Sequence, residues 1–461
     1  MAPGRGLAAE CAPGGRAVRV LKFGGTSVGT AEALRRAAAI VQKELPTGGL
    51  VVVSALSRTT DTILEAVKRA AKGQADEARA CHGVLLRRHL AVARELGLHE
   101  ALQPAWEPLF ERLAGILEGM GLLWEASPRA RDGALAVGET LSAHLLTALL
   151  EKEGCPAEFR EARAVMRTDA RHGRATPDLE AIKGASWIWR EAIQQGAVLV
   201  TQGFLGAAPD GATTTLGRGG SDTTATLLGE ALGADEVQIW TDVDGVLSAD
   251  PSLVSGARPI PVMSLREAAA LSAFGAKVLH ADSLAPQTRA HFRLVVANTH
   301  RPEASRTEIR VHSPERQPGE ITSVAYKEGL ACLRLPPARD LEPLFNAALR
   351  LQEVGAVRYG LLSTPDGSLL VVRPETAAAE VLLEELVATG LDLQRGWAVV
   401  ALVGEGLRQA PGRALGLLAS LQDEPIAGIL AGDTGVSLAF LLPETRLPTL
   451  IPRLHALCFG A

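Results

Sequence analysis

The stretch Val18–Gly29, which reads VRVLKFGGTSVG, sets a short apolar run directly before two glycines and two hydroxyl residues. Such a run is typical of a buried strand, and residues 31–44 have the apolar spacing of a helix. Glycines let a backbone approach a ligand closely, and a helix start offers N–H groups to an anion. Lys22 at the strand tip can reach the same anion. An ordinary βα turn with an exposed lysine is the alternative, since the stretch is neither a Walker A loop nor a G-x-G-x-x-G fingerprint.

Length, charge and cysteine content limit the class of protein. At 461 residues the chain has room for two to four domains. A formal net charge of −5 gives no sign of a nucleic-acid or membrane partner. The five cysteines lack metal-ligand spacing and favour a reducing, cytoplasmic setting. No apolar run approaches the length of a membrane span, and residues 1–16 are expected to form a disordered extension rather than a signal peptide.

Further predicted strands also end in small polar residues. They lie within residues 49–57, 196–206, 236–246 and 294–298. Strands alternate with helices up to about Val311, which predicts an α/β fold with a largely parallel sheet covered on both faces. The segment from Ile63 to Ser127 is helical in composition, and Pro128 is expected to mark its end. Ligands of open α/β sheets bind at the carboxyl ends of the strands.

Glu139 follows Gly138 at what the sequence predicts to be the start of an apolar helix. It is either a surface residue stabilised by the helix dipole or a carboxylate aimed at a substrate ammonium group. The segment alone does not decide between the two.

The segment Thr213–Asp222, TTTLGRGGSD, carries the densest set of anion-binding groups in the chain. The guanidinium of Arg218 can form a bidentate hydrogen bond with a carboxylate or a phosphate. Asp222, at the start of the following helix, can pair with Lys22 and hold it in place. A flexible loop that ends in an Asp N-cap is the alternative.

The composition changes near a polar, proline-containing linker at residues 313–320. Beyond it, short strands and helices recur as two βαββα units, predicted at residues 321–395 and 396–461. Neither unit carries a catalytic set of residues, so we expect them to bind ligands or to form oligomer contacts.

Taken together and in order, these motifs resemble those of the aspartate kinases in the amino acid kinase superfamily. The matching segments are Lys22–Ser27, Ser54–Ala55, Gly138–Glu139, Thr214–Asp222, Trp240–Gly245 and Phe274–His280. The resemblance covers nearly the whole chain. It implies a catalytic domain at residues 17–312, with a mostly parallel sheet sandwiched by helices, followed by two ferredoxin-like α+β ACT domains.

The resemblance implies the reaction ATP + L-aspartate → 4-phospho-L-aspartate + ADP, which opens lysine, threonine and methionine synthesis. The chemistry is consistent, because a carboxylate is already ionised at neutral pH and needs no general base. The difficulty is to bring two anions together, which calls for positioning and positive charge. ATP and Mg²⁺ are the implied cofactors, with the ion held mostly by ATP oxygens and water. An amino-acid effector at the ACT domains and a homodimer formed through them are also implied.

The same resemblance assigns residues to the site. Catalytic roles fall to Lys22, Asp222 and Lys277. Aspartate is bound by Thr60, Glu139, Arg218, Gly219, Gly220 and Ser221, with Arg218 on the α-carboxylate and Glu139 on the α-ammonium group. The nucleotide is contacted by Lys22, Phe23, Gly24, Gly25, Ser27, Thr241, Asp242, Leu247, Ser252 and Lys277.

Several positions depart from the family's pattern. The family often has Tyr where this chain has Leu247 and Arg where it has Ser252, which puts ATP affinity in doubt. Ala281 stands where Pro usually follows the histidine. Residues 357–360 read VRYG near the place where lysine-binding relatives carry Ser-Val-Asp. The missing acidic residue predicts weak or absent feedback by lysine.

Two other functions stay open at this point. One is a related kinase that phosphorylates glutamate or acetylglutamate, against which Glu139, Arg218 and the ACT pair argue. The other is a catalytically weak or silent amino-acid sensor of the same fold. Four residues argue against a sensor, namely Lys22, Arg218, Asp222 and Lys277, whereas Leu247 and Ser252 argue for it.

Overall fold

The apolar run before the glycine turn forms strand β1 (Arg19–Phe23), which pairs in parallel with β2 (Gly49–Val53) on one side and β7 (Glu236–Thr241) on the other. In this computed structural model the sheet continues through β4 (Val198–Gln202) to β3 (Ala157–Phe159) beyond β2, and to β9 (Arg293–Asn298) beyond β7, all in parallel. Every residue of β2 and β4 is buried, as expected of strands covered on both faces. The predicted mostly parallel sheet is confirmed.

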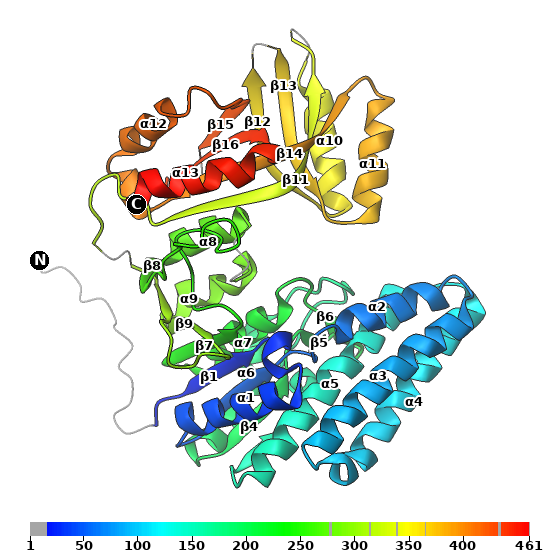
Figure 1. Cartoon of the computed structure of the whole chain (residues 1–461). Coiled ribbons are helices and arrows are strands. Elements are labelled where there is room, and N and C mark those ends of the chain that lie inside the picture. The colour runs from blue at the N-terminus through cyan, green and yellow to red at the C-terminus, as the bar shows by residue number, and fades with distance from the viewer. Residues whose placement is uncertain are drawn as a thin grey trace, which may run out of the picture. The chain divides into compact units, whose positions relative to one another are not determined.

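The structure describes residues 16–275, 279–312, 315–337, 340–364, 366–431 and 435–460. The chain divides into two compact units (Figure 1). The first contains the described residues of 1–242 together with 285–303. The second contains those of 243–284 and 304–461. The predicted catalytic domain at 17–312 therefore contributes a segment, 243–284, to the second unit.

Helices of the first unit surround its sheet. They are α1 (Ala31–Glu44), α2 (Thr59–Ala70), α3 (Ala75–Glu95), α4 (His99–Leu123), α5 (Pro128–Lys152), α6 (Leu179–Gln194), α7 (Gly220–Leu232) and α9 (Ala285–Ala290). A short hairpin joins β5 (Leu205–Ala207) to β6 (Thr213–Thr215). Figure 1 shows α2 to α5 packed side by side.

Helix α5 begins earlier than the sequence suggests. The predicted helical segment ends earlier, at Leu123 of α4, and Pro128 occupies the first turn of the next helix, α5, where proline is well tolerated because no N–H bond is lost. Ser127 caps the helix by accepting a hydrogen bond from the Ala130 N–H at 3.2 Å. Glu139 consequently lies in the middle of α5 rather than at a helix start. The expectation of a dipole-stabilised surface carboxylate is therefore wrong.

By length and composition α5 is also apolar enough to cross a membrane. However, 89% of its most apolar window is buried inside the fold. It is thus the core helix of the first unit, and its apolar character is explained by packing.

Arg58, which precedes α2, has a left-handed backbone with φ of 63°. This conformation strains a side chain by about 1 kcal/mol but not glycine. Replacing Arg58 with glycine should therefore raise the free energy of unfolding by about 1 kcal/mol, measured by urea denaturation. Arg58→Ala keeps the strain and should give no such gain. An equal gain from both variants would show that loss of the arginine charge, not backbone strain, is responsible.

The second unit contains a six-stranded antiparallel sheet in the order β12-β13-β11-β14-β16-β15. The strands are β11 (Ser323–Leu335), β12 (Ala356–Thr364), β13 (Gly367–Pro374), β14 (Asp392–Val403), β15 (Gly428–Ala431) and β16 (Ser437–Pro443). The helices are α8 (Leu265–Ala273), α10 (Glu342–Glu353), α11 (Ala377–Val387), α12 (Pro411–Ala419) and α13 (Leu447–Phe459). Strand β8 (Val262–Ser264) pairs in parallel with β10 (Thr307–Arg310).

Two hydrophobic cores lie along this sheet. Leu333 of β11 packs with α10 and α11 in one core. Val324, near the other end of the same strand, packs with α12 and α13 in the second core. Strand β14 likewise contributes to both cores. The segments that build the cores therefore interleave, whereas the sequence predicted two successive domains at 321–395 and 396–461.

Candidate active site

Lys22 and Asp222 meet at the carboxyl end of β1. The lysine Nζ lies 2.6 Å from Oδ1 of Asp222, and the two side chains are only 10% and 14% exposed. Asp222 stands in the first turn of α7, where a carboxylate is favoured by the helix dipole. The ion pair that the sequence predicted is confirmed, and it fixes an ammonium group at the strand tip.

The glycine turn lies directly beside this ammonium. The Gly24 N–H donates to the Trp240 carbonyl of β7 at 3.1 Å. A Cβ placed on Gly25 would lie 2.9 Å from the carbonyl oxygen of Ala55, so only glycine fits. A Cβ on Gly24 would stand 3.6 Å from Lys22 Nζ. The bare backbone of the turn thus adjoins the lysine.

Two residues predicted on the nucleotide side turn their side chains inward. Ser27 is fully buried, and its hydroxyl bonds Thr299 at 2.7 Å and the Trp240 carbonyl at 3.2 Å. Phe23 is fully buried and stacks on Trp240. Both side chains hold the turn against β7, so only backbone atoms of Phe23 and Ser27 are left for a ligand. The sequence could not show this, because the direction of each side chain depends on the neighbouring strand.

Glu139 is 4% exposed, and its Oε2 has no hydrogen-bond partner among the described residues. Burial raises the pKa of this carboxyl to about 8, although the Ala55 backbone and the Lys22 charge oppose the rise. A Cβ on the preceding Gly138 would lie 2.6 Å from Cγ2 of Thr59, so the glycine allows α5 to pack closely on α2. A buried carboxyl with one oxygen that has no hydrogen-bond partner among the described residues is suited to receive a cation.

The loop that carries Arg218 is shaped by glycines. Gly217 and Gly219 have φ of 80° and 70°, and a Cβ on Gly220 would lie 2.6 Å from Phe204. Arg218 is exposed, whereas Ser221 lies half-buried at the start of α7. The loop therefore places Arg218 directly before the end of α7 that holds Asp222.

Asp132 organises this loop and was not assigned a role from the sequence. It is fully buried in α5 and accepts the Thr215 hydroxyl at 2.8 Å and the Gly173 N–H at 2.9 Å. His172 Nδ1 lies 3.1 Å away. Asp132 thereby ties β6, just before Arg218, to residues 172–173. Its signal in the sequence was a lone carboxylate at the head of an apolar helix.

The remaining predicted residues of the first unit lie at the end of a strand or at the start of a helix. Thr60 is half-buried in the first turn of α2. Thr241 ends β7, which pairs with β1, and its hydroxyl lies 3.2 Å from Oδ1 of Asp242. Because β1 and β7 are parallel neighbours, Thr241 and Asp242 lie at the sheet edge that carries Lys22.

Two predicted nucleotide residues, Leu247 and Ser252, belong to the second unit. The Leu247 carbonyl accepts the Ser323 hydroxyl at 3.0 Å. Ser252 donates both its N–H and its hydroxyl to Asp250 Oδ1, at 2.9 and 2.6 Å, and so completes a turn. Lys277 lies outside the described residues, and its role stays a prediction.

The chain is similar to known proteins along most of its length. Residues 17–298 match the amino acid kinase family. The lysine-sensitive aspartokinase 3 of Escherichia coli is 31% identical over 455 residues, which cover 95% of this chain and 99% of that protein. An aspartokinase of Chlamydia trachomatis is 41% identical over 282 residues, or 61% of each chain.

Solved structures give the same result. The E. coli aspartokinase III structure in complex with aspartate and ADP has a TM-score of 0.81 at 30% identity, covering 95% of this chain and 99% of that one. Its complex with lysine and aspartate also has a TM-score of 0.81, over 96% of this chain. The fold and these matches lead to one conclusion: the chain belongs to the amino acid kinase family and, within it, to the aspartokinases.

Proposed function

We propose that the protein transfers the γ-phosphoryl group of ATP to the side-chain carboxylate of L-aspartate, giving 4-phospho-L-aspartate and ADP, the first step of lysine, threonine and methionine synthesis. The observation that carries the proposal is the buried Lys22–Asp222 ion pair beside the bare glycine turn. Attack by a carboxylate needs no base, so the principal requirement is positive charge where the two anions meet. Lys22 supplies that charge.

On the phosphoryl side, Lys22 neutralises the transferred group as negative charge builds on its oxygens. Asp222 orients the lysine at 2.6 Å. The backbone at Gly24 and Gly25 lets the phosphate come close without a Cβ in the way. Positioning and electrostatics, rather than proton transfer, thus account for the catalysis.

On the aspartate side, Glu139 receives the α-ammonium group and Arg218 the α-carboxylate. Thr60 and Ser221 add hydrogen bonds, and the backbone of Gly219 and Gly220 leaves room for the substrate. Two charged side chains therefore bind the two charged groups on the α-carbon of aspartate. The side-chain carboxylate of aspartate is left free to face the phosphoryl group.

In the first unit, the nucleotide side comprises Thr241 and Asp242 at the end of β7 and the turn around Gly24. The nucleotide roles of Leu247, Ser252 and Lys277 stay predictions from the sequence. ATP is taken as its magnesium complex. The described residues contain no group of three His, Cys, Asp or Glu side chains able to hold a metal ion. We expect phosphate oxygens and water to supply most of the ligands of the ion, as is common for Mg²⁺.

An acceptor panel tests this function. Acyl phosphate is trapped with hydroxylamine in the presence of MgATP and either L-aspartate, L-glutamate or N-acetyl-L-glutamate. We expect hydroxamate with L-aspartate alone. N-acetylation removes the ammonium group that Glu139 receives, and glutamate is one methylene too long. Turnover with either of the other acceptors would favour a related kinase, whereas no turnover with any acceptor would favour a silent sensor.

Feedback by lysine is expected to be weak. E. coli aspartokinase III has been solved with lysine, but residues Val357–Gly360 on β12 of this chain contain no carboxylate to hold an effector ammonium. Typical allosteric coupling changes an affinity by about 5- to 150-fold. We expect saturating L-lysine to change the aspartate kinase rate by less than about fivefold. Strong inhibition at low lysine concentration would refute the interpretation of this segment.

We propose that a second copy of the chain binds the second unit, at its six-stranded sheet and the adjoining helix α10. Large apolar side chains are exposed on α10, β12 and β15: Phe345 (52%), Leu349 (62%), Val357 (44%), Leu361 (37%) and Ile429 (48%). Contact with a second copy would bury this surface. Sedimentation equilibrium should show a homodimer, and a strictly monomeric chain would contradict the proposal.

We propose that the protein acts in the cytoplasm, because the spacing of its five cysteines favours a reducing compartment.

A further inference from the structure

A cavity of about 630 Å³ lies in the first unit, and none of the residues assigned to aspartate or to the nucleotide lines it. Its walls are the segment that leads into α1, the segment that leads into α2, and one side of α3. The lining includes two arginines, Arg58 and Arg88, but among the described residues no carboxylate. A cavity of this size accommodates a small metabolite.

Neither arginine has an acidic partner within the part of the chain that the structure describes. The Arg88 guanidinium donates to two backbone carbonyls, those of Ser57 and of Gly29, the latter at 3.3 Å. The Arg58 side chain forms no ion pair with any described residue, although Asp61 stands only three positions further along the chain. Burial and the charge of Arg58 lower the pKa of Arg88. Because the two like charges repel each other, an anion between them would stabilise both.

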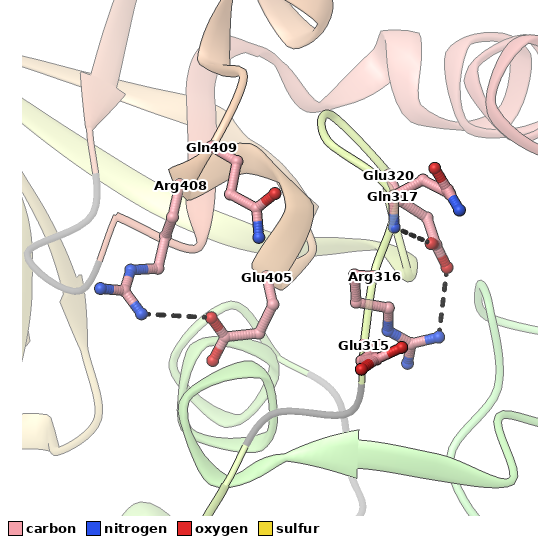
Figure 2. A pocket seen from close by; sticks show the side chains of 7 residues that line it. All are labelled: Glu315, Arg316, Gln317, Glu320, Glu405, Arg408 and Gln409. Carbon is pink, nitrogen blue, oxygen red and sulfur yellow. Dashed lines mark hydrogen bonds and ion pairs between the residues drawn. The ribbon is translucent and has the colours of Figure 1, made fainter.

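Figure 2 shows a cavity of about 770 Å³ in the second unit, whose arginines are compensated instead. Arg316 contacts Glu320 at 3.1 Å, and Arg408 meets Glu405 at 3.5 Å. The protein itself balances the positive charge in that cavity. Uncompensated positive charge therefore distinguishes the cavity that contains Arg58 and Arg88.

Arg58 occupies a backbone conformation that suits glycine better than arginine. Its φ of 63° is left-handed, and the residue stands as the N-cap of α2. Backbone strain of this kind persists where a side chain serves a function that offsets the loss of stability. The strain thus supports a functional role for the guanidinium at this position.

Hydroxyl groups complete the set of donors around the two arginines. The Thr30 hydroxyl caps α1 by accepting the Ala33 N–H at 3.1 Å, so its own hydrogen remains available to a ligand. The hydroxyls of Thr26 and Ser57 also line the cavity, and they form no hydrogen bond with other described residues. The starts of α1 and α2 add a field that favours negative charge.

We propose that this cavity binds a phosphomonoester, with its phosphate between Arg58 and Arg88. A phosphomonoester carries a charge of about −1.5 to −2 at pH 7 and three acceptor oxygens, which match two guanidiniums and the nearby hydroxyls. A monocarboxylate balances only one of the two positive charges. Val84 on α3 is 49% exposed and lines the same cavity, so it offers an apolar surface to the carbon part of the ligand.

This cavity shares its backbone with the glycine turn that adjoins Lys22. The Ser57 N–H donates to the Gly25 carbonyl at 3.0 Å. A Cβ on Gly29 would lie 3.0 Å from Cβ of Ser57, so the two segments are in close contact. Because Lys22 is also proposed to hold a phosphate, a test has to separate the two sites.

The test is isothermal titration of the full chain, without nucleotide, with phenyl phosphate, inorganic phosphate and benzoate as probes. We expect phenyl phosphate to bind with a Kd below about 1 mM and at least about tenfold more tightly than the other two. Arg58→Gln and Arg88→Gln should each weaken its binding by at least about tenfold, because each removes one charge partner. Arg58→Lys keeps the charge and should bind within about threefold of the parent. Val84→Ser should weaken binding of phenyl phosphate but not of inorganic phosphate.

Two control variants locate the probe. Lys22→Met removes the charge beside the glycine turn, and Arg408→Gln removes a charge from the cavity in Figure 2. Both should bind phenyl phosphate as the parent does. Loss of binding in either control, with binding retained in Arg58→Gln, would overturn the proposal.

Two further results would also overturn it. One is equal affinity for phenyl phosphate and inorganic phosphate, which would show a site for the free ion. The other is a Kd for phenyl phosphate above about 1 mM. None of these measurements depends on turnover, so failure of this proposal and failure of the proposed kinase function are distinguishable.

Discussion

Replacing Lys22 with methionine should lower kcat with L-aspartate by about 10³-fold, which corresponds to about 4 kcal/mol of transition-state stabilisation. The side chain is buried against Asp222 at 2.6 Å, so its charge acts with little screening by water. Methionine keeps the length and apolar stem but removes the charge. The measurement is steady-state hydroxamate formation, with the melting temperature of the variant as a check on folding.

A matched variant separates charge at the site from charge in general. Lys43 also forms an ion pair with a carboxylate, Glu303, but its side chain is 58% exposed. Lys43→Met should leave kcat within about twofold of the parent, because exposed pairs contribute little. If Lys22→Met retained more than a tenth of the parental kcat, the proposed charge neutralisation would be wrong.

Because of Glu139, kcat/KM for L-aspartate should depend on pH. Burial raises the pKa of its carboxyl to about 8, so at pH 7 about nine-tenths of the free enzyme carries it protonated. The substrate ammonium requires the carboxylate form. Because the ionised fraction grows as pH rises, kcat/KM for L-aspartate should increase by nearly tenfold per unit well below the pKa and level off above about pH 8.

Two measurements check this assignment. Glu139→Gln should lower kcat/KM by about 10- to 100-fold at pH 8.5 and abolish the rise with pH, since the amide does not titrate. Calorimetry in buffers of different ionisation enthalpy should show about one proton released as aspartate binds at pH 7. Glu151→Gln, on the exposed face of α5, is the control. An unchanged pH profile in the Glu139 variant would contradict the proposed role.

The sheet and the ion pair could be predicted because each depends on local sequence. Continuous apolar runs such as β2 specify a strand buried on both faces, and the polar strand ends specify the edge where a ligand binds. Lys22 at one strand tip and Asp222 at a helix start were therefore expected to meet. The short strands and helices after residue 320 were also recognisable from their periodicity and turn residues.

Features that depend on packing between distant segments could not be predicted in this way. The burial of Glu139 follows from the close approach of α5 to α2 at Gly138, and Ser27 faces inward because β7 and Thr299 provide its partners. The long strands β11 and β14 serve two cores, although nothing in their sequence marks where one core ends. The contribution of Asp132 likewise appears only when β6 and residues 172–173 come together around it.

The most direct test of the central claim identifies which carboxylate receives the phosphoryl group. The enzyme is incubated with MgATP and L-aspartate, and the acyl phosphate is reduced with borohydride. The account predicts homoserine, the product of reducing the activated side-chain carboxyl, formed in step with ADP and absent with Lys22→Met. Formation of 3-amino-4-hydroxybutanoate, which derives from the α-carboxyl, or release of ADP and phosphate with no reduced product, would contradict it.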